Sequence, residues 1–364
     1  MEIRRYVGFA AALAGVATLA CFPTPSWETY RGGAGRAGSL RPGLSGPPGG
    51  PAWHVTLAAP SYSSPVWTDR TLLVGSSDDT LAVLDAATGN VRWRFRTRGD
   101  VAGGVAVAGG YAYFGAADGM VYAVDLRRRR SRWEFRADNK VVADAVVAGG
   151  RVFVGTLGGT LYALDARTGK PAWSASQLGP LWAAPSYAAG RLYVASRDGR
   201  LRAFDAATGR ALWEYDAGAP LGAAPLVVGT NVYAASETGD VFAVDTLTGQ
   251  RRWSYAAGAG VSGIAADAQA LYFGTWGGAC VAVTLARGER LWQTPLDGAV
   301  EGCPAVAGGV LFVATAAGKI AALDAPTGAV KWSADLAGGV SGTPAVGPDA
   351  LYVVTDDGAV FAYR

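Results

Sequence analysis

Short hydrophobic stretches rich in β-favouring residues, each followed by a turn signal, alternate along most of the chain. One unit has such stretches at 141–147, 151–156, 160–165 and 171–176, separated by glycine pairs or by a polar turn. Glycine signals between short β-favouring stretches are typical of hairpins, so this spacing predicts four antiparallel strands. No segment shows the periodicity of an amphipathic helix. The pattern therefore predicts an all-β protein.

A motif that ends in tryptophan closes each unit. It reads Asp-x-x-Thr-Gly-x-x-x-Trp at Asp165–Trp173 and recurs in full at four other places. The period is 40 residues with one slip of a single residue, and four strands per 40 residues is the size of a β-propeller blade. The tryptophans of the series are Trp53, Trp93, Trp133, Trp173, Trp213, Trp253, Trp292 and Trp332.

The two ends of the repeat array complement each other. The last unit, 340–364, contains three predicted strands and stops before its tryptophan, whereas 51–57 offers a tryptophan-bearing fourth strand with no first three. Joining the two predicts an eight-bladed propeller whose last blade is closed by the N-terminal strand. Closure also removes the exposed edges of an open array. Seven blades plus a loose strand is the alternative.

We interpret the motif as a structural joint between blades. Its glycine can adopt left-handed backbone geometry, and its Asp and Thr side chains can accept hydrogen bonds from N–H groups of the turn. The eight tryptophans are then docking residues that pack on the neighbouring blade. Burial of one such ring contributes about 2–3 kcal/mol.

Two copies of the motif are altered. In the sixth unit Thr284 and Arg287 replace the Asp and the Thr. In the second unit Arg128 and Arg129 replace the Thr and the Gly, within the run Arg127, Arg128, Arg129, Arg130. A solvated turn explains such a run. The alternative is a contact for anionic lipid head groups or an acidic partner.

The N-terminus has the character of an export signal. Two arginines precede an apolar run from Val7 to Ala20, which is short for a bilayer span. The run ends at Cys21 and resembles the lipobox of bacterial lipoproteins, although an ordinary cleaved signal is the alternative. We expect a signal peptide at 1–20, a Gly- and Pro-rich flexible linker at 21–50 that follows a lipidated Cys21, and the propeller at 51–364.

Composition and charge argue against several classes of function. The net charge is +3 with both signs scattered, so no nucleic-acid-binding stripe is predicted. Three cysteines form no disulfide framework, although Cys280 and Cys303 could pair in principle. His54 is the single histidine and has no visible catalytic partner. We therefore predict no enzyme activity, no cofactor and no metal site.

The form Ala-x-Asp-x-x-Thr-Gly-x-x-x-Trp, as at 163–173 and 203–213, resembles the docking motif of pyrroloquinoline-quinone-type propellers. With eight blades and a lipid anchor, the chain is similar to BamB-type lipoproteins of the outer-membrane assembly machinery. This resemblance implies a monomeric, non-catalytic scaffold on the periplasmic side of the outer membrane. It also implies envelope proteins as partners, among them a β-barrel assembly complex.

The chain departs from the quinone enzymes that share the motif. It has no adjacent cysteines, and the channel-facing positions of the first strands contain two carboxylates, Asp144 and Glu301, and no Lys or Arg. The predicted outer ring is Tyr62, Ala102, Val142, Trp182, Gly222, Ser262, Glu301 and Ser341. The predicted next ring is Ser64, Gly104, Asp144, Ala184, Ala224, Ile264, Cys303 and Thr343.

Two hypotheses for function remain open. In the first, a scaffold presents Leu157, Trp182, Arg197 and Trp276 on one face to partner proteins, with the 127–130 arginine run as a further contact. Trp276 could instead fill the gap left by the one-residue deletion in its unit. The loops 177–181 and 218–222 keep leucines but lack the Arg and the acidic residues of the BamB-type partner surface. In the second hypothesis, a small ligand or cofactor binds at the channel mouth.

Overall fold

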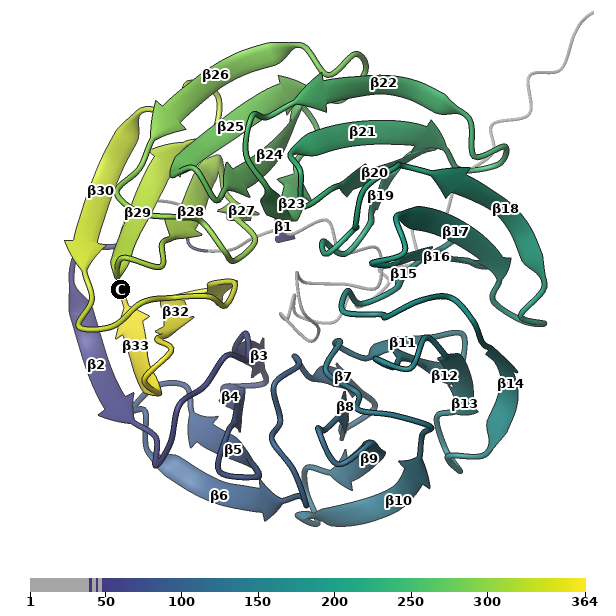
Figure 1. Ribbon diagram of the computed structural model, residues 1–364. Coiled ribbons are helices and arrows are strands. Elements are labelled where there is room, and N and C mark those ends of the chain that lie inside the picture. The colour runs from purple at the N-terminus through teal and green to yellow at the C-terminus, as the bar shows by residue number, and fades with distance from the viewer. Residues whose placement is uncertain (1–38, 41–43, 45–47) are drawn as a thin grey trace, which may run out of the picture.

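Eight sheets are arranged in a ring (Figure 1), and residues that lead into their first strands line a central cavity. The computed structural model describes residues 39–40, 44 and 48–364. The predicted all-β, eight-bladed propeller is confirmed, and the seven-bladed alternative is wrong. The predicted signal peptide, Cys21 and most of the linker lie outside the described residues.

Seven blades each take four consecutive strands. Blade 1 is β3 (Val66–Thr68), β4 (Thr71–Ser76), β5 (Thr80–Asp85) and β6 (Val91–Arg96). Blade 2 is β7 (Ala106–Ala108), β8 (Tyr111–Gly115), β9 (Met120–Asp125) and β10 (Arg130–Arg136). Blade 3 is β11 (Val146–Ala148), β12 (Arg151–Gly155), β13 (Leu161–Asp165) and β14 (Pro171–Ala175). Blade 4 is β15 (Ser186–Ala188), β16 (Arg191–Ala195), β17 (Arg200–Asp205) and β18 (Ala211–Asp216).

The second half of the ring repeats this order. Blade 5 is β19 (Leu226–Val228), β20 (Asn231–Ala235), β21 (Asp240–Asp245) and β22 (Arg251–Ala256). Blade 6 is β23 (Val261–Ala266), β24 (Ala270–Thr275), β25 (Ala279–Thr284) and β26 (Arg290–Pro295). Blade 7 is β27 (Ala305–Ala307), β28 (Val310–Ala314), β29 (Lys319–Asp324) and β30 (Val330–Asp335), with β1 (Ser39–Leu40) added parallel to β27.

Blade 8 joins the two ends of the repeat array, as predicted. It contains β31 (Ala345–Val346), β32 (Leu351–Val354), β33 (Ala359–Tyr363) and the N-terminal strand β2 (Pro51–Thr56). Strand β2 pairs antiparallel with β33. Figure 1 shows purple β2 outside yellow β33. The sequence did not predict β1.

The first strand of blade 3 is shorter than the sequence predicts. In blade 3 the prediction was 141–147, but β11 covers only Val146–Ala148. The entering segment instead binds the preceding blade, because the N–H of Val141 donates to the carbonyl of Ala116 at 3.2 Å. The residues at 141–145 therefore do not pair in their own sheet: Val142 and Asp144 line the channel mouth, whereas Val141 and Ala145 are buried in a hydrophobic core.

The predicted docking of tryptophan on the next blade is observed for six of the eight residues. A β-bulge precedes the tryptophan in every blade, and in blade 3 the register shifts between Ala163 and Leu164. Bulges re-aim side chains, and here the indole Nε1 of Trp173 donates to the carbonyl of Ala206 at 3.1 Å. The matching bonds are Trp53 to Ala86, Trp133 to Ala166, Trp213 to Thr246, Trp253 to Leu285 and Trp292 to Ala325.

The turn glycine provides the surface on which the indole lies. Gly209 has φ +75°, and a methyl group on it would lie 2.6 Å from the Trp173 ring. Any side chain at this position would therefore displace the indole as well as strain the backbone. The glycine is thus the indispensable residue of the joint.

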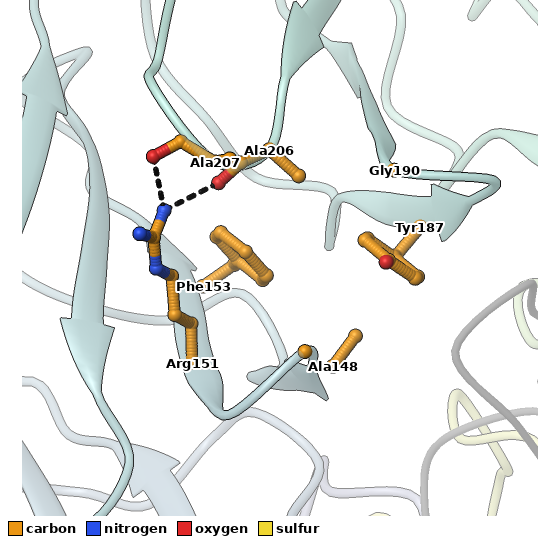
Figure 2. A pocket seen from close by; sticks show the side chains of 8 residues that line it. Ala148, Arg151, Phe153, Tyr187, Gly190, Ala206 and Ala207 are labelled. Carbon is orange, nitrogen blue, oxygen red and sulfur yellow. Dashed lines mark hydrogen bonds between the residues drawn. The ribbon is translucent and has the colours of Figure 1, made fainter.

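In most blades, a side chain on the second strand also contacts the motif turn of the next blade and strengthens the joint. The hydroxyl of Tyr113 donates to the carbonyl of Ala166, which also accepts from Trp133. In blade 3 the equivalent residue is Phe153, and Figure 2 shows Arg151 reaching the carbonyl oxygens of Ala206 and Ala207 beside it.

The predicted roles of the motif Asp and Thr are also confirmed. Asp165 Oδ1 accepts from the N–H and the hydroxyl of Thr168 at 2.8 and 2.6 Å. In three blades the bulged residue is a cation that pairs with the motif aspartate, as Arg92 does with Asp85 at 2.6 Å. The other two pairs are Arg252 with Asp245 and Lys331 with Asp324.

The two altered copies of the motif have different outcomes. In blade 6, Gly288 is retained with φ +69°, and Trp253 packs on it and donates to Leu285. In blade 2, Arg129 occupies the glycine position with φ +57°. Within the described part of the chain, no hydrogen bond joins the Nε1 of Trp93 to the second blade. The indole therefore still docks where the Asp and the Thr are replaced, whereas its hydrogen bond and its glycine contact are missing where the Gly is replaced.

Trp213→Ala should lower the free energy of unfolding by about 3 kcal/mol, because it removes a docked indole and leaves a cavity. Trp93→Ala should cost roughly half as much, because that indole lacks its hydrogen bond and its glycine surface. Urea unfolding followed by circular dichroism measures both. Equal losses in the two variants would contradict the assigned joint.

Gly169→Ala should destabilise the protein by about 2 kcal/mol, because the new methyl would lie 2.6 Å from the Trp133 ring at a φ of +72°. The reverse change, Arg129→Gly, should be neutral or stabilising by up to about 1 kcal/mol. Thermal unfolding compares the two, and a neutral Gly169→Ala would show that the glycine surface is dispensable.

Acid should weaken the motif turns. The hydrogen bond from Arg92 lowers the pKa of Asp85 to about 2, and hydrogen bonds led by the Thr248 N–H lower the pKa of Asp245 to about 2. Because these folded-state values lie below the unfolded value of about 3.9, their stabilisation is complete above that pH and is lost as the pH falls towards 2. The unfolding temperature of Asp245→Asn should fall less steeply than that of the parent over this range. An unchanged slope would count against the assignment.

Candidate functional site

The hairpin order divides the loops between two faces. Strands in each blade run antiparallel, so the turns between strands two and three share one face with the connections between blades. We call this the channel-mouth face. The turns between strands one and two and between strands three and four, which include the Asp-Thr-Gly motif, lie on the opposite face. We call that the motif face.

The channel mouth is lined as the sequence predicted for its outer ring. A cavity of about 160 Å³ is bounded by all eight residues of that ring, from Tyr62 to Ser341. The second ring is only partly correct, because Ile264 and Cys303 are buried in the hydrophobic cores of the blades. Blade 6 has a register shift between Val261 and Ile264, which changes the direction of the side chains after it.

The carboxylates at the mouth form a network that the sequence analysis missed. The hydroxyl of Ser341 lies 3.0 Å from Glu301 Oε2 and 2.9 Å from Asp356 Oδ2. Burial, together with nearby Glu301, raises the pKa of Asp356. Asp356 lies in the turn between β32 and β33 and contacts the channel-facing ring through Ser341. Asp144 lies in another part of the ring and accepts a hydrogen bond from the N–H of Gly104.

At the channel-mouth face, one backbone hydrogen bond recurs in every blade, and the side chain of the residue that makes it varies from blade to blade. The first residue of each turn between strands two and three donates its N–H to the preceding connection, as Arg197 does to the carbonyl of Pro180 at 3.1 Å. The same bond occurs in all eight blades. The residues at this position are Ser77, Ala117, Leu157, Arg197, Glu237, Trp276, Ala316 and Asp356.

The largest of these side chains are consecutive. Leu157, Arg197, Glu237 and Trp276 belong to blades 3 to 6, and Trp182 lies beside Arg197. We call these five residues the arc. The arc unites the four partner residues predicted on this face and adds Glu237.

Contacts within the arc fix its charged residues. The guanidinium of Arg197 lies 5.3 Å from the Trp182 ring and 2.7 Å from Glu237 Oε2. Trp182 remains 50% exposed and Trp276 remains 45% exposed. Trp276 covers Gly260, where a methyl group would lie 2.4 Å from the indole. It therefore packs on the backbone of the preceding connection and still presents a broad apolar surface.

The arginine run does not join the arc. Arg127 to Arg130 lie on the motif face at the turn of blade 2, and all four side chains are exposed. Arg128 pairs with Asp125 at 3.0 Å, which also accepts from the N–H groups of the turn. Among the described residues, no acidic side chain pairs with Arg127, Arg129 or Arg130. The predicted partner residues therefore form two separate surfaces.

The joint between blades 1 and 2 contains a larger cavity than its intact counterpart. Its volume is about 560 Å³, and its lining includes Trp93 and Arg129. At the equivalent place between blades 3 and 4, shown in Figure 2, the cavity is about 160 Å³. Arg151, Phe153 and Tyr187 occupy that space, whereas Thr71, Leu73 and Val107 stand at the same positions here.

The cysteines and the histidine considered in the sequence lie in packed surroundings. Cys280 and Cys303 are both buried, and no disulfide joins them. His54 stacks on Phe361 at 5.7 Å. No cluster of three metal-ligating residues occurs among the residues with described positions. In the same part of the chain, no helix has the length and apolar character to cross a membrane.

Comparisons with known proteins agree on the fold. A family model described as outer membrane protein assembly factor BamB matches residues 43–143, 136–271 and 277–364. No curated protein sequence matches the chain significantly. The crystal structure of BamB from Moraxella catarrhalis is similar, with 23% identity and a TM-score of 0.74, over 86% of this chain and 99% of that one.

Solved structures of other proteins share the fold as well. Quinohemoprotein alcohol dehydrogenase from Comamonas testosteroni has 16% identity and a TM-score of 0.81, over 93% of this chain and 80% of that one. The computationally designed Ika8 protein has 16% identity and a TM-score of 0.78, over 85% and 97%. Identities this low establish the architecture alone. The family match across most of the sequence, on an eight-bladed propeller with docked tryptophans, shows that the chain belongs to the BamB family of pyrroloquinoline-quinone-like β-propellers.

Proposed function

We propose that the chain is a non-catalytic scaffold of the bacterial envelope, anchored by lipid at Cys21 on the periplasmic side of the outer membrane. It binds partner proteins through the arc on the channel-mouth face and takes part in the assembly of outer-membrane β-barrel proteins. The family match supports this role at the level of the family.

The observation that carries the proposal is the exposure of two tryptophans next to a fixed charge pair. Trp and Arg are the side chains most often found at the energetic centre of protein interfaces. Trp182 and Trp276 offer exposed apolar surface to a partner. The Arg197–Glu237 ion pair holds both charged side chains in place, so that they can form oriented polar contacts with it. The backbone beneath them is held by the repeated turn bond, so little conformational entropy is lost when a partner binds.

The partner surface of this chain uses residues other than the leucines considered in the sequence. Leu178, Leu181 and Leu221 are buried in the blade cores. They support the loops at 177–181 and 218–222 from below. The arc therefore replaces these leucines as the exposed apolar surface.

A small ligand or cofactor at the channel mouth is the second candidate. The mouth places Trp182 near carboxylates, which could orient a polar ligand. However, its volume of about 160 Å³ is below the range of about 300–1,000 Å³ typical of cofactor pockets. Its lining contains no Lys or Arg to hold an anionic quinone. The size and charge of the mouth favour the scaffold.

Affinity capture from solubilised envelopes tests the scaffold. The double variant Trp182→Ala/Trp276→Ala should lose at least nine-tenths of the β-barrel assembly complex that co-purifies with the parent chain, since both apolar anchors are removed. Leu247→Ala is the matched control, because Leu247 is 64% exposed on the motif face. It should retain the complex.

Two results would contradict the scaffold. One is full retention of the complex by the double variant. The other is saturable binding of a quinone with calcium to the parent chain in calorimetry, abolished by Trp182→Ala, which would favour the channel-mouth ligand.

A further inference from the structure

The joint between blades 1 and 2 lacks the glycine surface and the indole hydrogen bond that close six of the other joints. Arg129 replaces the glycine surface, Leu73 replaces the tyrosine or phenylalanine of strand two, and Trp93 makes no hydrogen bond to a described residue. The indole therefore remains beside an open cavity of about 560 Å³ instead of a filled joint.

The walls of this cavity are apolar. Trp93 and Val83 contribute from blade 1, and Val107 and Leu126 contribute from blade 2. The same residues pack against one hydrophobic core, so their positions are set by the fold. An aromatic or aliphatic group would find an apolar surface here without any rearrangement of the backbone.

The rim of the cavity is cationic. Arg92, Arg127 and Arg129 line it, and Asp69 is the one carboxylate among the lining residues. Arg92 is engaged by Asp85 at 2.6 Å. Arg127 and Arg129 have no acidic partner among the described residues, so the rim keeps an excess of positive charge even after Asp69 is counted.

Thr68 and Thr71 add neutral hydrogen-bonding groups to the rim. Arg129 is held at the rim by a left-handed backbone conformation, φ +57°, that glycine adopts more readily. The turn thus contains an arginine at a position where the backbone conformation favours glycine.

We propose that this cavity binds an organic anion that carries an apolar group. The anionic group, a phosphate, carboxylate or sulfonate, is bound by Arg127 and Arg129, whose guanidinium groups match the geometry of such oxyanions. The apolar group packs against the indole of Trp93. The volume lies within the range of small-molecule sites, and a bare inorganic ion would leave the apolar wall uncovered.

This site is separate from the arc. It lies on the motif face, whereas the arc lies on the channel-mouth face, so a ligand here and a protein partner there could be bound together. Binding of the anion does not depend on the proposed scaffold role.

A pair of fluorescent probes tests the site. 8-Anilinonaphthalene-1-sulfonate carries an apolar aromatic group and one negative charge, and N-phenyl-1-naphthylamine carries the same group without the charge. The full chain should bind the sulfonate at least about tenfold more tightly than the neutral probe, and the preference should weaken as salt is added.

Three variants locate the binding. Arg127→Gln removes one rim charge, and Arg129→Gly removes the second and restores the glycine surface on which Trp93 can dock. Each should weaken sulfonate binding at least fivefold. Arg167→Gln is the matched control, because Arg167 occupies the position of Arg127 in the intact turn of blade 3. It should leave the affinity unchanged, and unfolding curves confirm that all three variants are folded.

Competition then identifies the source of the anion. Displacement of the probe by phenyl phosphate indicates a free small molecule, and displacement by phosphatidylglycerol vesicles but not by phenyl phosphate indicates a lipid head group. Either result supports the anion site. Equal affinities for the two probes, or unchanged affinity in both Arg127→Gln and Arg129→Gly, would overturn it.

Discussion

The contact between an indole and the turn glycine of the next blade holds this ring together. Each blade has only a narrow sheet, and a sheet of this kind cannot bury both faces alone. The bulge before each tryptophan turns the indole towards its neighbour, and the left-handed glycine leaves room for it. Where the glycine survives, as at Gly288, the joint forms even though the motif aspartate is lost. Where it is replaced, at Arg129, the joint opens.

This dependence separates the structural and variable parts of the molecule. The backbone bonds of the turns between strands two and three repeat in every blade, while their side chains range from Ala117 to Trp276. Because the tryptophan on the fourth strand joins each blade to the next, the side chains of the turns between strands two and three can vary without loss of stability. The arc and the open joint are two results of that freedom, one on each face.

Much of the fold follows from the sequence, because the motif has a fixed spacing and each of its residues has one physical task. The blade number and the closing strand are confirmed, and six of the eight tryptophans dock on the next blade as predicted. The length of the first strand of blade 3 is not confirmed, because Val141 bonds to the preceding blade, and local propensity carries no information about that contact. Ile264 was placed in the channel because a register shift in β23 cannot be recognised from alternation alone. Asp356 and Glu237 were missed because both lie in ordinary hairpin signals, although the period of 40 residues aligns them with Arg197 and Trp276.

The pairing of β2 with β33 has a consequence for how the chain reaches its native state. Pro51 and Tyr363 are partners, so the last sheet brings together segments from opposite ends of the described chain. The entropy lost in joining such distant segments is recovered only when both are present, and the other seven sheets can form from neighbouring residues before that. Until β2 is placed, β33 offers an unpaired edge to any other extended segment, including the β2 of a second molecule. Exchange of this strand between two copies is therefore the characteristic misassembly open to this architecture.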